Sequence, residues 1–142
     1  MRRTNVALVV YLGIACCTAE AEDLPKAVAA KIKEVYPRAK IHEVESEVKD
    51  GKLRYEVELK IGKKERDVFL TPEGEVIQVA DEISVKSVPA AVLKAAKKLY
   101  PDMPVREAER ITRDGKTYYL VELRRWIKEI EVEFTPAGEE VK

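Results

Sequence analysis

The chain has 142 residues, 46% of them hydrophobic and 37% charged, which is enough for one ordinary domain or two very small ones with a real core. Its 26 lysine and arginine residues are balanced by 26 aspartate and glutamate residues, so the formal net charge is zero. Because the two signs are interspersed, there is no basic field that would neutralise phosphates, and we expect no nucleic-acid partner.

The first 21 residues have the pattern of a secretory signal peptide. Arg2 and Arg3 form a positive start, residues 6–15 are a short apolar run, and Ala19 and Ala21 fit the small-residue cleavage pattern. The apolar run is too short for a typical membrane span. We therefore predict cleavage after Ala21 and a periplasmic or secreted protein.

Both cysteines, Cys16 and Cys17, belong to this segment. Cleavage after Ala21 would leave an exported domain with neither a disulfide nor a thiol nucleophile. The alternative is a lipoprotein signal in which Cys16 or Cys17 is acylated, although Gly13 stands where such signals usually have a large aliphatic residue. In either case the membrane is contacted only through this segment.

The rest of the chain contains an internal sequence repeat. Residues 24–78 align with residues 88–142 without a gap, and 22 of the 55 aligned pairs are identical. The shared positions include Pro25 and Pro89, Tyr36-Pro37 and Tyr100-Pro101, the Asp-Gly-Lys triplets at 50–52 and 114–116, and the Thr-Pro-x-Gly segments at 71–74 and 135–138. An internal repeat sets the architecture. We predict a first repeat at 22–79, a connector at 80–87 and a second repeat at 88–142.

Each repeat is predicted to open with a helix. In the first, apolar side chains fall on one face at helical spacing, namely Leu24, Val28, Ile32, Val35 and Tyr36. The second repeat has the same arrangement. Each helix should end at Tyr-Pro, because proline disfavours helical geometry in the residue before it.

Four strands are predicted after each helix. In the first repeat they cover residues 41–49, 52–61, 66–70 and 75–79, with Asp50-Gly51 suited to a tight hairpin turn. In the second repeat the fourth strand is placed at residues 139–142. The predicted fold is α+β: two tandem helix-plus-four-stranded antiparallel meander repeats, with both helices packed on one face of a wide curved sheet.

This combination of a signal peptide, a helix ending in Tyr-Pro, an Asp-Gly-Lys hairpin, a Tyr-x-Val-Glu-Leu strand and a Thr-Pro-x-Gly turn resembles the PepSY-like family. It is most similar to exported bacterial proteins described as β-lactamase-inhibitor-like. The resemblance covers essentially the whole predicted mature chain. The resemblance implies a non-catalytic exported module. In the β-lactamase inhibitor after which these proteins are described, a concave sheet surface binds the enzyme. For PepSY modules that occur together with peptidases, the resemblance implies an inhibitory or chaperone-like role. The family has no motif of partner-contacting residues that can be matched to individual positions of this sequence.

Catalytic and metal sites are not expected. The sole histidine, His42, aligns with Arg106 of the second repeat, which favours an exposed polar position. Nucleophilic catalysis needs a base beside its nucleophile, and a typical zinc or copper site needs several histidines or cysteines. We therefore predict that the protein is not an enzyme and holds no cofactor.

Two runs of glutamates leave a question open. The carboxylates that share a strand face are Glu43, Glu45 and Glu47 in one run, and Glu129, Glu131 and Glu133 in the other. Each set could offer hard oxygen ligands to calcium. The other interpretation is a solvated face that deters edge-to-edge aggregation. We favour the solvated face, because no glycine-punctuated loop of Asp and Asn gathers the oxygens around an ion.

The strongest functional signal is a difference between the copies on the face opposite the predicted core. On this face the predicted strand of the first copy has only charged residues, whereas the second copy has a set that includes aromatic and apolar side chains: Tyr118, Leu120, Glu122, Arg124 and, next in the same register, Trp126. Tyrosine, tryptophan and arginine are enriched in interface hot spots. The alternatives are that the other half, a loop or a second copy covers these side chains, or that a bulge flips the register.

The leading hypothesis is thus a non-catalytic exported protein-binding module, such as an inhibitor or modulator of an exported hydrolase or peptidase, that binds through this open sheet face. The alternative is a calcium- or ligand-binding envelope protein that uses its glutamate-rich strands.

Overall fold

The computed structural model describes residues 24–142. The predicted signal peptide, its cleavage site and both cysteines lie outside these residues. The elements in chain order are α1 (Lys26–Val35), β1 (Lys40–Lys49), β2 (Lys52–Ile61), β3 (Lys64–Leu70), β4 (Val76–Glu82), a 3₁₀ turn (Val85–Ser87), α2 (Ala90–Leu99), β5 (Val105–Arg113), β6 (Lys116–Arg125) and β7 (Lys128–Phe134).

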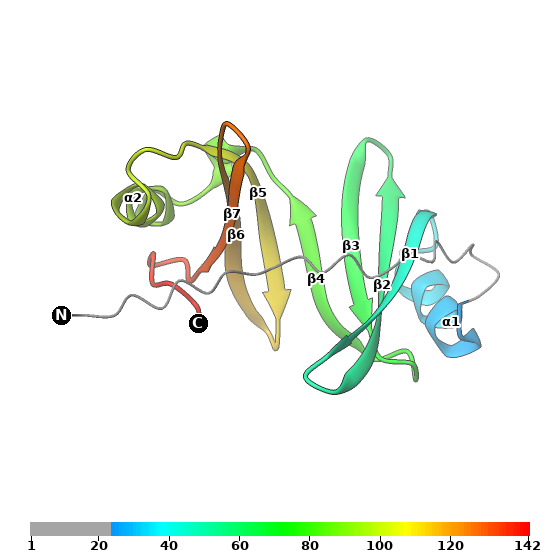
Figure 1. Ribbon diagram of the computed structural model, residues 1–142. Coiled ribbons are helices and arrows are strands. Elements are labelled where there is room, and N and C mark those ends of the chain that lie inside the picture. The colour runs from blue at the N-terminus through cyan, green and yellow to red at the C-terminus, as the bar shows by residue number, and fades with distance from the viewer. Residues whose placement is uncertain (1–23) are drawn as a thin grey trace.

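All seven strands belong to one sheet. They lie in sequence order from β1 to β7, and every neighbouring pair is antiparallel. Figure 1 shows the sheet between the two helices, which lie at opposite ends of the molecule. The predicted α+β class with an antiparallel meander is confirmed. Within residues 24–142, neither helix has the length and apolar composition needed to span a bilayer.

The predicted fourth strand of the second repeat is wrong. Glu140 forms only an isolated bridge with Phe134. In the first repeat the corresponding strand, β4, runs on through residues 80–82 of the predicted connector and pairs with β3 on one side and β5 on the other. Residues 139–142 have a neighbour on one side only among the described strands. Strand β4 forms ladders with both β3 and β5, whereas residues 139–142 make only the isolated bridge to β7.

Both helices begin after a proline and end where expected. Pro25 and Pro89 precede the first helical residues, and the helices stop at Val35 and Leu99, directly before the two Tyr-Pro pairs. The prediction that Val35 belongs to the buried face is wrong, because Val35 is 46% exposed. The buried stripe of α1 follows the four-residue spacing from Val28 through Ile32 to Tyr36, which rotates Val35 away from the sheet.

Each helix covers its own part of the core. The α1 core contains Leu24, Val28, Ile32, Val44, Val57, Leu59, Val68 and Leu70. The α2 core contains Val88, Val92, Ala96, Met103, Ala108, Val121, Leu123, Val132 and Phe134. Most strand members of these two cores alternate with polar residues, as expected for a sheet with one covered face and one open face, but Phe69 and Leu120 put apolar side chains on the open face.

Strand register places both helices on the same face of the sheet. Asp81 of β4 pairs with Arg66 of β3 and with Arg110 of β5, and directly paired side chains point to the same face. Arg66 shares its face with Val68 of the α1 core, and Arg110 pairs with Tyr119, which packs against the α2 core.

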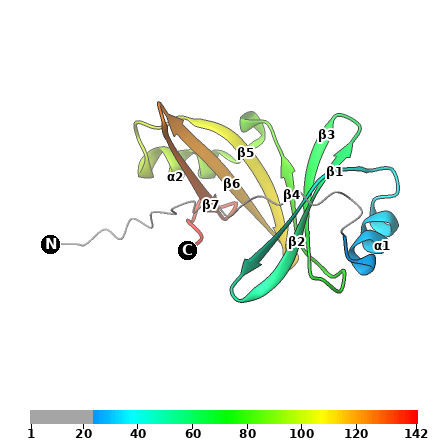
Figure 2. The same cartoon turned by 45° about the vertical axis from the view of Figure 1, so that its right-hand side comes forward.

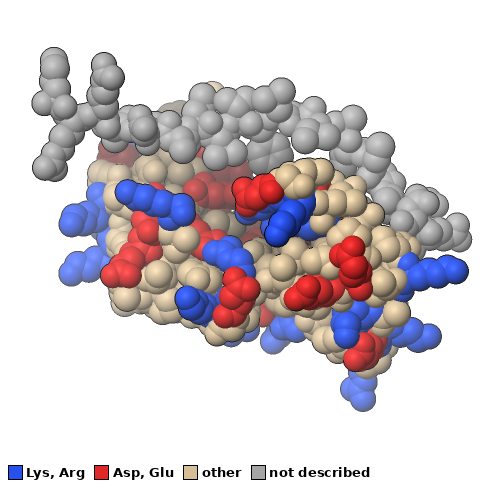
Figure 3. All heavy atoms as spheres, turned by 90° about the horizontal axis from the view of Figure 1, so that it is seen from below, with Lys and Arg blue, Asp and Glu red and all other residues tan. Residues whose placement is uncertain are grey.

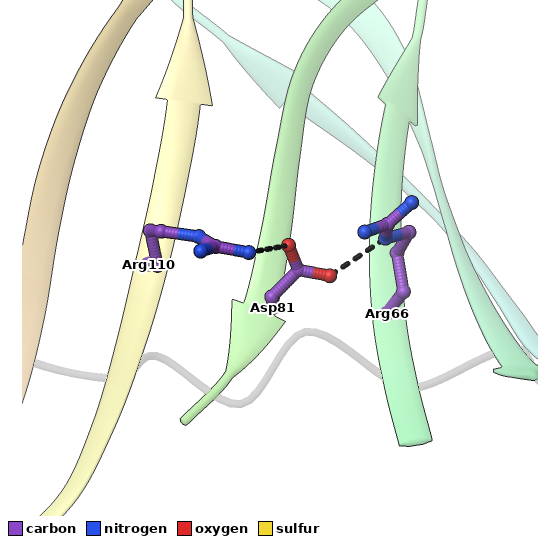
Figure 4. A network of polar contacts seen from close by, with 3 residues as sticks. All are labelled: Arg66, Asp81 and Arg110. Carbon is purple, nitrogen blue, oxygen red and sulfur yellow. Dashed lines mark hydrogen bonds and ion pairs between the residues drawn. The ribbon is translucent and has the colours of Figure 1, made fainter. Parts of the chain in front are cut away.

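An ion-pair network ties the two repeats together on this helix-bearing face. Figure 4 shows the Asp81 carboxylate between two guanidinium groups, with 2.6 Å to Arg66 Nε and 3.1 Å to Arg110 Nη2. Partial burial alone would raise the pKa of Asp81, but hydrogen bonds from Arg66 and Arg110 outweigh it and lower that pKa below its ordinary value. The ionised form of Asp81 therefore stabilises the junction.

The two Thr-Pro-x-Gly turns pack against the helices. Gly74 has φ of 85° and Gly138 has φ of 84°, the left-handed region that favours glycine. A Cβ atom at Gly74 would lie 2.6 Å from the Ala27 carbonyl oxygen, and one at Gly138 would lie 2.6 Å from the Ala91 carbonyl oxygen. The turns touch the helix backbones where only glycine fits.

We predict that Gly74→Ala destabilises the protein by about 1–3 kcal/mol more than Gly62→Ala does, as measured by urea unfolding. Both glycines have positive φ, but a Cβ atom at Gly62 meets nothing within 4 Å. The control thus carries the same backbone strain without the clash. Equal losses in the two variants would contradict the close packing of this turn against α1.

Candidate binding face

The open face of the sheet, opposite the helices, carries an acidic hollow of about 320 Å³. Its walls come from strands of both repeats and consist of Glu43, Glu45, Glu56, Glu58, Glu65, Asp67, Glu82, Glu107, Ala108 and Glu109. No lysine or arginine is among these lining residues. On the face seen from below, acidic and basic side chains lie beside one another (Figure 3).

The close packing of carboxyl groups in the hollow raises the pKa values of three of them. Burial, followed by repulsion from Asp67 and Glu45, raises the pKa of Glu56 to about 7. Burial, then Glu58, raises the pKa of Asp67 to about 6. Burial, then Asp67, raises the pKa of Glu109 to about 7. Asp67 belongs to the first repeat and Glu109 to the second, so the hollow couples the two repeats electrostatically. A bound cationic group would relieve this repulsion.

Beside the hollow, the same face carries a small apolar cluster that both repeats share. Phe69, Ala80 and Ile111 are buried, and Ile77, Tyr118 and Leu120 pack against them. The guanidinium of Arg54 lies 4.6 Å from the centre of the Phe69 ring, and that of Arg113 lies 4.7 Å from the centre of the Tyr118 ring. These distances are typical of cation–π contacts.

Tyr118 and Leu120, two of the predicted partner contacts, therefore lie half-buried in this cluster. Their neighbours Phe69 and Ala80 belong to β3 and β4 of the first repeat. This packing agrees with one of the alternatives above, in which the other half of the protein covers these side chains. Their use by a partner stays a prediction.

Glu122 and Arg124 form a polar group on β6, where Glu122 pairs with Glu107 of the hollow lining. Arg124 Nη2 lies 2.8 Å from a Glu122 carboxylate oxygen, and Arg124 Nε donates to Glu129 at 3.1 Å. Carboxylate oxygens of Glu122, Glu129 and Glu131 lie within 4.8 Å of one another, close enough for a cation. The Arg124 guanidinium supplies a positive charge to Glu122 and Glu129, so a cation would compete with it.

Trp126 does not continue the strand register, and that prediction is wrong. Strand β6 ends at Arg125, which pairs with Lys128 of β7, so Trp126 and Ile127 form a two-residue hairpin turn. Trp126 is 88% exposed, and Ile127 is fully exposed. The repeat contained a signal for this turn, because Trp126 aligns with Gly62 and the matched turn of the first repeat is Gly62-Lys63.

His42 is placed as expected for an exposed polar residue. Its Nε2 atom lies 4.0 Å from a Glu58 carboxylate oxygen, at the rim of the hollow. The glutamates Glu43 and Glu45 of the first predicted run line the hollow, whereas Glu47 pairs with Arg54. In the second run Glu129 and Glu131 join Glu122, whereas Glu133 pairs with Arg113 at 2.6 Å.

Sequence reasoning missed Asp67, Glu82 and Glu109 as members of a site. Alternation along residues 64–70 already places Asp67 on the polar face, and Glu109 aligns with Glu45. What could not be read from the sequence is the pairing of β4 with β5, which brings these carboxylates from different repeats to one hollow.

The fold and the open face define a tandem α+β repeat protein with one helix-covered and one exposed sheet face. The family model described as beta-lactamase-inhibitor-like, PepSY-like matches this chain twice, at residues 17–78 and 73–141. The chain therefore belongs to the PepSY-like family. This confirms the resemblance inferred from the motifs. No curated protein matches the chain.

Solved structures from Bacteroides share the fold. A protein of Bacteroides eggerthii, provisionally described as periplasmic, has 20% identity over 83% of this chain and 86% of its own, with a TM-score of 0.67. A DUF2874 family protein of Bacteroides uniformis has 20% identity over 83% and 86%, with a TM-score of 0.66. A BLIP-like protein of Bacteroides fragilis has 20% identity over 82% of each chain, with a TM-score of 0.59.

The raised pKa values of Glu56, Asp67 and Glu109 predict that stability falls as pH rises from about 5 to 8. A carboxyl whose pKa is higher in the folded than in the unfolded state stabilises the fold fully below its unfolded pKa, and this contribution is lost as pH rises through about 6 to 7. Urea unfolding across this range measures the slope.

The triple variant Glu56→Gln, Asp67→Asn, Glu109→Gln should flatten this dependence. A charge-matched control replaces Glu73, Glu75 and Glu139, which are exposed in or beside the Thr-Pro-x-Gly turns, by glutamine. A triple variant that keeps the wild-type slope would rule out the hollow as its source.

The variants Tyr118→Ala and Trp126→Ala should differ in stability, because one ring is packed and the other is exposed. We expect Tyr118→Ala to lower the free energy of unfolding by about 1–2 kcal/mol, because it opens the shared cluster. Trp126→Ala should change it by no more than about 0.5 kcal/mol, since the ring is exposed. Similar thermal midpoints for both variants would contradict the placement of Tyr118.

Proposed function

We propose that this protein is a non-catalytic exported binding module that holds a basic segment of a partner protein against the open face of its sheet. The observation that carries this proposal is the acidic hollow, in which nine carboxylates of two repeats line about 320 Å³ without a basic residue among them. A lysine or arginine side chain would bring the charge that the hollow lacks and would form charge-assisted hydrogen bonds there.

We infer that the sheet is curved, with the open face on the concave side. On a flat sheet, β1 and β5 would be separated by four strand spacings, about 19 Å. Yet Glu43 of β1 and Glu109 of β5 line the same small hollow. In Figure 2 the strands of the two repeats run at a marked angle to each other. A concave face supports the binding of a protruding segment.

Two observations support export to the periplasm or beyond. The first 21 residues have the pattern of a signal peptide, and the similar protein of Bacteroides eggerthii is provisionally described as periplasmic. The BLIP-like description of the Bacteroides fragilis protein supports a role as an inhibitor or modulator of an exported hydrolase or peptidase.

The proposal is tested with decalysine as a model basic segment, by titration calorimetry at low and high salt. We expect salt-dependent binding that the hollow variant Glu56→Gln, Asp67→Asn, Glu109→Gln weakens at least about tenfold, because three of the carboxylates that attract the peptide are neutral. The control variant of Glu73, Glu75 and Glu139 should bind like wild type. Equal affinity in the two variants would contradict the proposal.

The inhibitor role has its own assay. Wild-type protein and the hollow variant are added to a purified exported β-lactamase during hydrolysis of a chromogenic substrate. Slower hydrolysis with wild type and not with the hollow variant would support inhibition through this face. Unchanged hydrolysis with both would remove this enzyme from the candidates and leave decalysine binding as the test of the face.

A second candidate function is calcium binding, favoured by the group of Glu122, Glu129 and Glu131, whose oxygens lie within 4.8 Å of one another. Calorimetry with calcium chloride on wild type and Glu131→Gln decides it. Heat of binding that Glu131→Gln abolishes would support calcium binding, and no heat at millimolar calcium would exclude it.

A further inference from the structure

Strand β1 is an edge of the sheet whose outer side has no partner strand among residues 24–142. It pairs with β2 alone, and the pairing is regular from Glu43 to Lys49. Among the backbone hydrogen bonds that the described residues make outside helices and strands, none involves residues 40–49. Every second residue of such a strand points its N–H and C=O groups away from the sheet. The outer side of β1, cyan in Figure 1, therefore offers a ladder for one more strand.

The other edge strand, β7, is covered at its end by the chain itself. Val141 donates its backbone N–H to the Glu133 carbonyl at 2.9 Å, and Glu140 forms a bridge with Phe134. Strand β7 is also shorter than β1. Within residues 24–142, β1 is thus the longer open edge of the sheet.

The second repeat shows how a strand docks on an edge of this kind. Strand β5 has the place in the second repeat that β1 has in the first, and its residues 109–113 align with residues 45–49. Along residues 109–113, β4 pairs antiparallel with β5, from Glu82 to Gln78. The internal repeat therefore indicates that residues 45–49 can accept an antiparallel strand in the same register.

The open-face side chains of β1 favour a basic strand. Residues 43–48 read Glu-Val-Glu-Ser-Glu-Val, so three glutamates point to the open face, because side chains alternate along a strand. Glu43 and Glu45 line the acidic hollow, and Glu47 pairs with Arg54. The edge therefore continues the acidic surface of the hollow. Opposite charges that face each other across paired strands stabilise the pairing.

On the helix-bearing face the same edge is uncharged. Val44 belongs to the α1 core, Ser46 follows it, and Val48 is 69% exposed. Val48 pairs with Leu53 of β2, which is 43% exposed, so apolar surface stays open beside the edge. An apolar side chain of an added strand would cover this surface. The complementary strand thus has basic and apolar residues in alternation.

The same glutamates disfavour a second copy of β1 as the added strand. Antiparallel pairing of two β1 strands centred on Glu45 would place Glu45 opposite its own copy and Glu43 opposite Glu47. Like charges directly opposite each other destabilise a strand pair. Charge complementarity therefore selects a basic segment from another protein over self-association at this edge.

We propose that the outer edge of β1 binds an extended segment of a partner protein as an additional antiparallel strand, with lysine or arginine at alternate positions facing Glu43, Glu45 and Glu47. The proposal rests on the proposed function and extends it, since the hollow supplies the charge and the adjoining edge supplies a backbone ladder. Main-chain hydrogen bonds give affinity in this mode of binding, and the alternate side chains give specificity.

The test compares two peptides of equal charge and about nine residues, the length of a typical strand, by titration calorimetry. One peptide alternates lysine with valine, and the other alternates lysine with proline. Proline removes backbone donors and does not continue a ladder. We expect the lysine–valine peptide to bind at least about tenfold more tightly. Equal affinities would overturn the proposal, because charge alone would then hold the segment.

Amide hydrogen exchange followed by NMR locates the bound peptide. With the lysine–valine peptide present, we expect alternate amides within residues 45–49 to exchange at least about tenfold more slowly, because their outward N–H groups enter a ladder. The amides of β7, the other edge strand, are the control and should not change. Peptide binding without protection of β1 would overturn the proposal.

The variant Val48→Lys changes the edge without changing the hollow. It adds a positive charge beside the added strand on the helix-bearing face, so the lysine–valine peptide should bind at least about threefold more weakly. The control Leu99→Lys replaces another exposed apolar residue, in the helix at the other end of the molecule (Figure 1), and should bind like wild type. Thermal midpoints check that both variants fold. Equal affinities in the two variants would contradict the proposal.

Failure of this inference is distinguishable from failure of the proposed function. If decalysine binds through the hollow, but the lysine–valine peptide has no advantage and β1 gains no protection, the hollow alone holds the segment and the edge proposal is wrong. If neither decalysine nor the lysine–valine peptide binds, both proposals are wrong. Protection of β1 amides that rises with protein concentration without peptide would assign the edge to a second copy and overturn the inference.

Discussion

The pairing of β4 with β5 is the interaction on which the rest of the molecule depends. Five residue pairs, from Gln78 with Arg113 to Glu82 with Glu109, join the end of the first repeat to the start of the second. On the helix-bearing face, Asp81 adds ion pairs to Arg66 and Arg110 across the same junction. On the open face, Ala80 and Ile111 meet in the shared apolar cluster. Without this ladder there would be two small sheets, each with a helix and a modest core.

The ladder also creates the candidate site. Asp67 and Glu109 lie on opposite sides of β4, and they line one hollow only because β4 pairs with both of their strands. Repulsion from Asp67 raises the pKa of Glu109 beyond the effect of burial. Asp81 on the other face has the opposite role, since its ionised form is stabilised by two arginines. One face is thus arranged for stability, while the other keeps a repulsion that a cationic partner would relieve.

Local features were predictable from sequence because they depend on neighbouring residues. The Tyr-Pro pairs end both helices, Asp50-Gly51 and Asp114-Gly115 form hairpin turns, and alternation assigns Val57 and Leu59 to the core. Features that depend on the partner of a strand were not predictable. Residues 80–82 look like a polar connector but become strand when β5 lies beside them, and residues 139–142 lack such a neighbour among the described strands. The half-buried state of Tyr118 likewise depends on β3 and β4. Trp126 was misplaced because alternation was extended past the strand end that Gly62 marks in the other repeat.

NMR titration of the Glu109 side-chain carboxyl, in wild type and in Asp67→Asn, tests most directly whether the two repeats build one acidic site. Asp67 reaches Glu109 only through the continuous sheet, and after burial it is the largest cause of the raised pKa of Glu109. We expect that pKa to be about 7 in wild type and lower in Asp67→Asn, with Glu73→Gln as a control that leaves it unchanged. The same pKa for Glu109 in all three proteins would contradict a hollow shared between the repeats.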